Sequence, residues 1–156
     1  MTLEEISTLI RSSMFANIGF IDADGNPGIR KVFCTWHKGV GTHLISTNTS
    51  SMHVQAFLKN PSASLYFDNS KTFEGICFTG KVTVHFDKEY KTMCWKEGDE
   101  QYYPQGMEDE DYCIIEFRAK AGRFYRYDGI GNVTKAEMEE FDRGAEFVDY
   151  YDRLNA

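Results

Sequence analysis

Two polar segments carry the residues best suited to hold an anion. The first, Arg30-Lys31, begins a predicted strand directly after a turn. The second is the run 46–51, Ser-Thr-Asn-Thr-Ser-Ser, which ends the next predicted strand and opens a helix. Cations, hydroxyls and free N–H groups at a helix start are the components of a phosphate site. The two segments can converge, because a tight turn joins their strands. A basic strand edge followed by an ordinary Ser/Thr helix cap fits the same pattern.

No other motif indicates a particular chemistry. The Gly-x-Gly runs at 39–41 and 129–131 do not continue as dinucleotide-binding fingerprints, and the chain has no nucleophile elbow, H-E-x-x-H or P-loop. The acidic run 108–111 is interpreted as a solvated loop. The histidines lack metal-ligand spacing and are interpreted as hydrogen-bonded surface or rim residues; they are His37, His43, His53 and His85.

The cysteines are widely spaced and form no C-x-x-C pair; they are Cys34, Cys77, Cys94 and Cys113. This usage indicates buried free thiols in a reducing cytoplasm. The acidic N-terminus lacks the basic start and apolar run of a signal peptide. No stretch reaches the roughly 18 apolar residues of a membrane span. We therefore expect a cytoplasmic protein without a membrane or metal partner.

Composition and charge restrict the function further. A chain of 156 residues with 42% hydrophobic residues is expected to form a single globular domain, 1–156. Residues 1–96 hold 10 Lys/Arg against 8 Asp/Glu, or +2, whereas residues 97–156 hold 7 against 16, or −9, which together give the net charge of −7. Such an acidic chain is not typical of a nucleic-acid binder. An anionic ligand is expected on the N-terminal part.

Hydrophobic periodicity and turn residues predict the elements that position these groups. Helices are expected at 1–14, at 52–58, from Asp87 to about residue 96, and at 134–155. Strands are expected at 15–22, 29–38, 42–47, 62–68, 72–87, 112–118 and 123–128, the last two as a closing hairpin. Hairpin turns dominate and long crossovers are scarce. The order favours a mainly β protein, an antiparallel Greek-key-like barrel with flanking helices.

The same residues carry a family resemblance. Arg30-Lys31-Val32-Phe33, Ile45-Ser46-Thr47-Asn48 and Ser51 with Asn60-Pro61 resemble the pyridoxamine 5'-phosphate oxidase-like FMN-binding split-barrel family. Asp22 to Pro27 resembles its first hairpin and Gly80-Lys81-Val82 its central strand. Tyr103-Pro104-Gln105-Gly106, followed by Cys113 to Phe117, resembles the general-stress-protein-like branch. The likeness covers roughly residues 1–130.

This resemblance implies a six-stranded antiparallel split barrel (15–130) and a homodimer with FMN at the interface. Arg30 would pair with the FMN phosphate, and Ser51 would hydrogen-bond to it. Val32 and Phe33 would present backbone to the flavin ring. The remaining implied cofactor-binding residues are Lys31, Thr35, Ser46, Thr47, His53 and Tyr127, the last where the oxidases have a tryptophan at the flavin.

The chain departs from the oxidases at three places. Met52-His53 replaces their Arg-Lys, so one phosphate cation is lost and the other becomes a partly charged histidine. Thr35 replaces their substrate-binding lysine. An acidic helix, 135–155, replaces their basic C-terminal segment. These departures argue against pyridoxamine phosphate oxidation.

Several functions stay open. The first is an FMN-dependent oxidoreductase acting on an unknown small-molecule substrate or reductant, with His37 and Tyr127 as candidate proton donors. The second is a non-enzymatic flavin-binding or stress-related protein. Haem binding, with His53 as axial ligand, and a nitroimidazole-reductase-like role are further alternatives.

Overall fold

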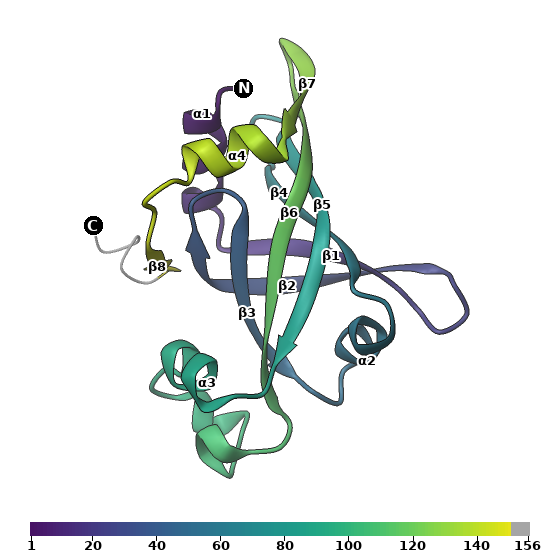
Figure 1. Ribbon diagram of the computed structural model, residues 1–156, viewed down its shortest axis with the longest axis vertical. Helices are drawn as coiled ribbons and strands as arrows, with labels where there is room; N and C mark the ends of the chain where they lie inside the picture. The colour runs from purple at the N-terminus through teal and green to yellow at the C-terminus, as the bar shows by residue number, and fades with distance from the viewer. Residues whose placement is uncertain (151–156) are drawn as a thin grey trace.

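The computed structural model describes residues 1–150 and is dominated by one antiparallel sheet that closes on itself (Figure 1). Six strands form the barrel in the order β1-β4-β5-β6-β3-β2, and β2 pairs back with β1. They are β1 (Phe15–Ile21), β2 (Pro27–Lys38), β3 (Thr42–Asn48), β4 (Ser62–Asn69), β5 (Glu74–His85) and β6 (Tyr112–Arg126). Two further strands extend the edges, β7 (Gly129–Thr134) on β6 and β8 (Phe147–Asp149) on β2. The predicted six-stranded antiparallel barrel is confirmed.

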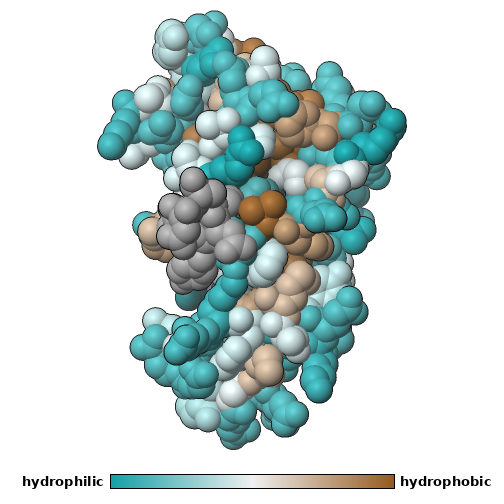
Figure 2. All heavy atoms as spheres, turned by 90° about the vertical axis from the view of Figure 1, so that its left-hand side faces the viewer, coloured by the Kyte–Doolittle hydropathy of each residue, from teal (hydrophilic) through white to brown (hydrophobic). Residues whose placement is uncertain are grey.

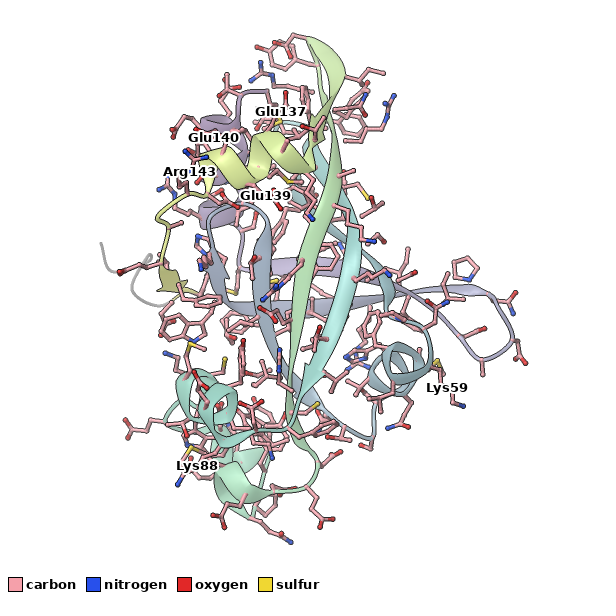
Figure 3. The ribbon with its side chains drawn as sticks, in the orientation of Figure 1. Lys59, Lys88, Glu137, Glu139, Glu140 and Arg143 are labelled. Carbon is pink, nitrogen blue, oxygen red and sulfur yellow. The ribbon has the colours of Figure 1, made fainter. Side chains whose placement is uncertain are left out.

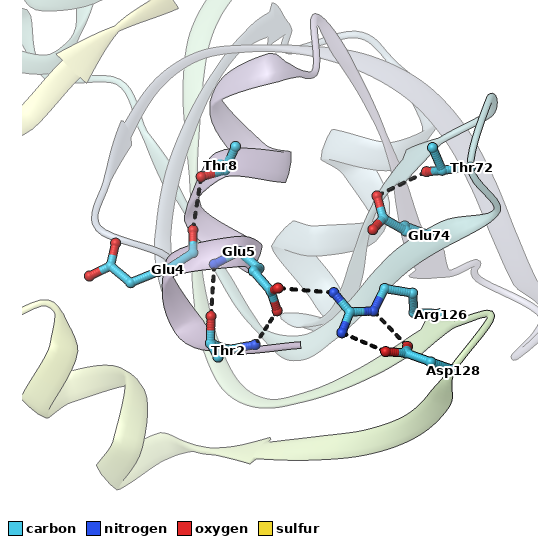
Figure 4. Close-up of polar contacts among 8 residues, drawn as sticks. All are labelled: Thr2, Glu4, Glu5, Thr8, Thr72, Glu74, Arg126 and Asp128. Atoms are coloured by element: carbon cyan, nitrogen blue, oxygen red, sulfur yellow. Dashed lines mark hydrogen bonds and ion pairs between the residues drawn. The ribbon is translucent and has the colours of Figure 1, made fainter.

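Short helices cover the ends and sides of the barrel. They are α1 (Leu3–Ser12), α2 (Met52–Lys59), α3 (Lys88–Cys94) and α4 (Lys135–Phe141), and the loop after α3 holds two 3-10 turns, η1 (Asp99–Gln101) and η2 (Gly106–Glu108). Thr2 and Glu5 form the predicted capping box of α1. The Glu5 carboxylate also forms an ion pair of 3.0 Å with Arg126, and Arg126 forms a second ion pair of 2.6 Å with Asp128 (Figure 4). The N-terminal helix is thereby tied to the end of β6.

Two apolar clusters hold the fold together. The larger fills the barrel, where alternate residues of every strand point inward, as Ile76, Phe78 and Val82 do on β5. The smaller lies outside the barrel beneath α3 and contains Leu44, Cys94, Tyr103, Tyr112 and Ile114. Burial raises the pKa of the Cys94 thiol to about 12, so this thiol stays protonated at neutral pH. All four cysteines are free.

The predicted closing hairpin of 112–118 and 123–128 is wrong. Residues 119–122, which we interpreted as its turn, lie inside the continuous strand β6. Ala119 and Ala121 are both paired with β5, and a β-bulge between them absorbs the irregular sequence. The hairpin turn lies instead between β6 and β7, because Arg126 pairs with Gly129.

The predicted helix 134–155 is also wrong beyond its first two turns. It begins as expected, with a capping box between Thr134 and Glu137, but ends at Phe141. Gly144 follows in the left-handed region (φ 77°), and the chain then forms β8 on the edge of β2. The carboxylate of Asp142 accepts hydrogen bonds from the backbone of Val40 and Gly41, which fixes this turn against the β2–β3 loop. Residues 151–155 of the prediction lie outside the described part.

On the side of the molecule that carries β8, hydrophilic residues dominate the top and the bottom of the surface, and a smaller apolar area lies near the middle (Figure 2). None of the helices within residues 1–150 is long and apolar enough to cross a membrane.

Candidate functional site

Four of the predicted site residues meet beside the start of α2, at the lower end of the barrel (Figure 1). Thr47 is the second-to-last residue of β3 and its side chain is buried; the turn after Asn48 brings the chain round into α2. The Nε2 atom of His53 lies 2.9 Å from Oγ1 of Thr47 and 3.4 Å from Oγ of Ser51. Arg30, on β2, is near enough for its charge to act on the His53 ring. Thr47, Ser51 and His53 are therefore in contact, and Arg30 acts on them through its charge; the joint role of the two polar segments in binding an anion stays a prediction.

Local sequence explains the shape of this turn. The Ser51 hydroxyl donates to the Asn48 carbonyl at 2.6 Å, and the Ser51 N–H donates to the same oxygen at 3.0 Å. Ser51 occupies the N-cap position, yet its side chain does not cap the helix. The first N–H groups of α2 therefore lack the side-chain acceptor that a serine at this position normally provides.

His53 is an uncharged hydrogen-bonding group at neutral pH. Only 1% of the residue is exposed. Burial lowers its pKa from 6.5 to about 4, and the positive charge of Arg30 acts in the same direction. The sequence led us to expect a partly charged ring, because burial cannot be read from its position in the chain. The Nδ1 atom of His53 is buried without a hydrogen-bond partner among residues 1–150.

Asp111 is a residue of this site that the sequence did not reveal. Its carboxylate accepts hydrogen bonds from the Ser50 N–H at 2.7 Å and from the Asn48 side-chain amide at 2.8 Å. These bonds, led by that of Asn48, lower the pKa of Asp111. We interpreted the acidic run 108–111 as solvated, and no local signal distinguishes Asp111 from its neighbours. It fixes the 48–51 turn and places a negative charge beside it.

Three other predicted residues lie on β2, away from this group. Val32 points into the barrel core. The neighbouring Lys31 and Phe33 point outward. The Lys31 ammonium lies 4.6 Å from the ring centre of Phe15, and the Phe33 ring packs edge-on against Tyr150 at 5.0 Å.

Thr35 and Ser46 lie on the α3 side of the barrel. The Thr35 hydroxyl donates to the Leu44 carbonyl at 3.3 Å and is buried. The Ser46 hydroxyl is also buried, and it lies beside Tyr112. Tyr127 stands at the β6–β7 turn with 82% of its surface exposed, at the opposite end of the barrel from α2 (Figure 1). Within one chain, Tyr127 does not join the other site residues.

The candidate proton donor His37 is placed differently from our expectation of a surface or rim histidine. It is buried, and its ring stacks on that of His43 at 6.3 Å. His43 in turn contacts the core rings of Phe67 and Phe78. Both histidines therefore belong to the barrel interior.

The group beside α2 fits a phosphate. Arg30 supplies a cation, Thr47 and Ser51 supply hydroxyls, and the helix start supplies N–H groups. The Nδ1 atom of His53 lies behind this group and is buried, so it does not face a ligand in this conformation. Within residues 1–150, no group of three or more His, Cys, Asp or Glu residues forms a metal site.

Comparisons with known proteins extend this picture. A family model described as pyridoxamine 5'-phosphate oxidase matches residues 2–126. A crystal structure of a protein related to general stress protein 26 of B. subtilis (pyridoxinephosphate oxidase family), from Clostridium acetobutylicum, is 32% identical. It has a TM-score of 0.79, and the match covers 87% of this chain and 96% of that one. A search of curated proteins found no match.

Two less similar structures share the fold. General stress protein 26 from Bacillus anthracis is 16% identical with a TM-score of 0.70, covering 85% of this chain and 97% of the other. A heme binding protein from Mycobacterium smegmatis is 14% identical with a TM-score of 0.71, covering 88% of this chain and 60% of the other.

Proposed function

Because this chain belongs to the pyridoxamine 5'-phosphate oxidase family, we propose that it binds FMN at the start of α2 and serves as an FMN-dependent oxidoreductase for a small molecule. The observation that supports the proposal most directly is the convergence of Arg30, Thr47, Ser51 and His53. Bound FMN supplies hydride or electron transfer. The roles of Val32, Phe33 and Tyr127 at the flavin ring remain predictions, as does the homodimer that would bring the Tyr127 turn of a second copy toward the site.

This chain's own residues would perform binding and orientation. Arg30 would neutralise part of the phosphate charge, and the Ser51 hydroxyl would have to turn away from the Asn48 carbonyl to donate to the phosphate. Thr47 holds the ring of His53 by its Nε2 atom, and the ring stays buried as a neutral support for the turn that begins α2. Pyridoxamine phosphate is not the proposed substrate. Met52 is an exposed apolar residue where the oxidases have a cation, and Thr35 is buried where they have a lysine.

Titration of FMN against the purified protein tests the binding step. We expect saturable quenching of flavin fluorescence. Arg30→Ala should raise the Kd by roughly 10- to 150-fold, since a charge-assisted hydrogen bond contributes about 1.5–3 kcal/mol. Arg143→Ala is the matched control, because Arg143 pairs with Glu140 on the exposed side of α4 (Figure 3). A protein that shows no saturable quenching, or equal weakening in both variants, would overturn the proposal.

A non-enzymatic flavin-binding role is the second candidate. The observation in its favour is the position of the candidate proton donors: His37 lies in the barrel interior and Tyr127 lies far from α2. Reduction of the bound flavin by NADH or NADPH, faster than reduction of free FMN, would favour the enzyme. The absence of such reduction, with FMN binding intact, would favour the binding protein.

The structure argues against His53 as a haem ligand. Its Nε2 atom is engaged by Thr47 and Ser51, and the ring is enclosed by Phe20 and Phe57 at 6.4 and 6.5 Å. Iron ligation would require this side chain to leave its pocket. In a haem titration, wild type and His53→Ala should therefore either both show the same Soret band or both show none. A band that wild type shows and His53→Ala lacks would identify His53 as the ligand.

A further inference from the structure

Positively charged side chains face one another on the outer surface of β5 and β6. Lys81 of β5 is the direct register partner of Arg118 of β6. Directly opposed residues in antiparallel strands project to the same face with Cβ atoms about 5 Å apart, and like charges there are destabilising. Glu116 compensates Arg118 with an ion pair of 3.3 Å. Lys81 has no such compensation among the described residues.

A β-bulge adds a third cation to the same surface. The register between β5 and β6 shifts so that Ala121 opposes Thr79 and Ala119 opposes Gly80, which leaves Lys120 as the extra residue. A bulge commonly re-aims a side chain. Here Lys120 lines the same cleft as Lys81 and Arg118, and it too forms no ion pair within residues 1–150.

These residues lie in a cleft of about 650 Å³ on the outside of the barrel, between α3 and α4. Tyr90, Met138 and Phe147 supply aromatic and apolar surface. Five cationic side chains from four elements line the cleft: Lys38, Lys81, Arg118, Lys120 and Lys135.

The carboxylates that line this cleft already have partners. Glu116 accepts from His85 at 3.0 Å as well as from Arg118. Glu139 pairs with Lys135 at 3.5 Å, and Asp142 accepts from two backbone N–H groups. The cleft thus keeps an excess of positive charge in a chain whose net charge is −7.

We propose that this cleft is a second ligand site, separate from the start of α2, that binds a small polyanion with two linked phosphate groups. Several cations distributed over four elements match a ligand with more than one anionic group better than a single anion. The volume is that of a small-ligand pocket, and its apolar wall leaves room for an organic part next to the phosphates. The proposal does not depend on FMN binding.

Isothermal titration with inorganic pyrophosphate at low ionic strength tests the proposal. We expect saturable binding in wild type and in Arg30→Ala. The double variant Lys81→Gln/Lys120→Gln should raise the Kd at least tenfold. Lys59→Gln/Lys88→Gln is the matched control, because it removes the same charge from α2 and α3 outside the cleft (Figure 3), and its Kd should change less than twofold. A second titration with ADP distinguishes a nucleotide from a free polyphosphate. A lower Kd for ADP than for pyrophosphate supports a nucleotide as the ligand, and equal Kd values support a free polyphosphate.

Three results would overturn the proposal. One is the absence of saturable pyrophosphate binding in wild type. Another is an equal loss in both double variants, which would mean that net charge alone attracts the ligand. The third is binding that Arg30→Ala abolishes and Lys81→Gln/Lys120→Gln leaves intact, which would place the ligand at α2. Thermal unfolding of each variant shows whether it is folded, and Lys81→Arg/Lys120→Arg, which keeps the charge, should keep the affinity.

Discussion

Acidification is expected to destabilise this protein through His53. The folded state buries the ring, and this burial, together with the charge of Arg30, lowers the pKa of His53 from 6.5 to about 4. The unfolded chain therefore binds the proton more tightly than the folded protein does. It follows that the stability due to a neutral His53 is fully present above about pH 6.5 and is lost as the pH falls towards 4.

The size of the effect follows from the two pKa values. Between pH 7 and pH 5 the unfolded chain takes up about three-quarters of a proton at this position and the folded protein takes up less than about a tenth. With 1.36 kcal/mol per pKa unit, the free energy of unfolding should fall by about 2 kcal/mol over this interval. His53→Gln removes the titrating group and retains a side chain that can hydrogen-bond to Thr47.

Urea unfolding of the ligand-free protein at pH 7, 6 and 5 measures the difference. All other ionisable groups are common to both proteins, so their contributions cancel when the two pH dependences are subtracted. We expect the wild type to lose about 2 kcal/mol more than His53→Gln between pH 7 and pH 5. Parallel pH profiles for the two proteins would refute the reasoning and show that the ring is already charged or solvated in the folded state.

Three substitutions test other parts of the fold. Gly80→Ala should destabilise the protein by about 1–3 kcal/mol in urea unfolding, because a Cβ there meets the backbone carbonyl of Arg118 at the bulge; an unchanged midpoint would show that the bulge can move. Asp142→Ala should cost about 1–3 kcal/mol by the same measure, because it leaves the part-buried N–H groups of Val40 and Gly41 without their acceptor. Arg126→Met should lower the thermal midpoint only slightly, because solvent screens its ion pairs with Glu5 and Asp128; a large drop in the midpoint would show that the α1–β6 contact is a cooperative part of the core.

The barrel could be predicted from the sequence because its signals are local. Alternating residues define β5, and Asp22 to Asn26 form a turn that leaves few alternatives for β1 and β2. The continuity of β6 could not be predicted, because Ala119 to Gly122 have turn-like composition and become strand only through pairing with β5 and β7. The end of α4 depends on Asp142 reaching the β2–β3 loop about 100 residues earlier in the chain. The hydrophobic periodicity of residues 134–155 does not reveal a contact with a loop so far away in the chain.

The candidate site likewise contains some residues whose positions the local sequence predicts and others whose positions depend on distant contacts. Arg30 and Thr47 lie on consecutive strands joined by a tight turn, and Arg30 acts through its charge on His53, the hydrogen-bond partner of Thr47; the strand order that the sequence predicts is sufficient to place these segments near each other. Asp111 reaches the same turn from the loop before β6, and Lys120 reaches its cleft through a bulge. Both positions depend on strand register, which the sequence alone did not resolve.

The charges around α2 also bear on how tightly this chain can hold a phosphate. Arg30 is the one cation that the converging group contributes, since His53 is uncharged at neutral pH and Met52 carries no charge. Asp111 adds a negative charge at the 48–51 turn and already occupies the Ser50 N–H. A phosphate beside α2 would therefore depend on Arg30 and on neutral donors. Among the described residues, the larger excess of positive charge lies in the cleft of Lys81 and Lys120, whereas the start of α2 carries Met52-His53 and not two cations.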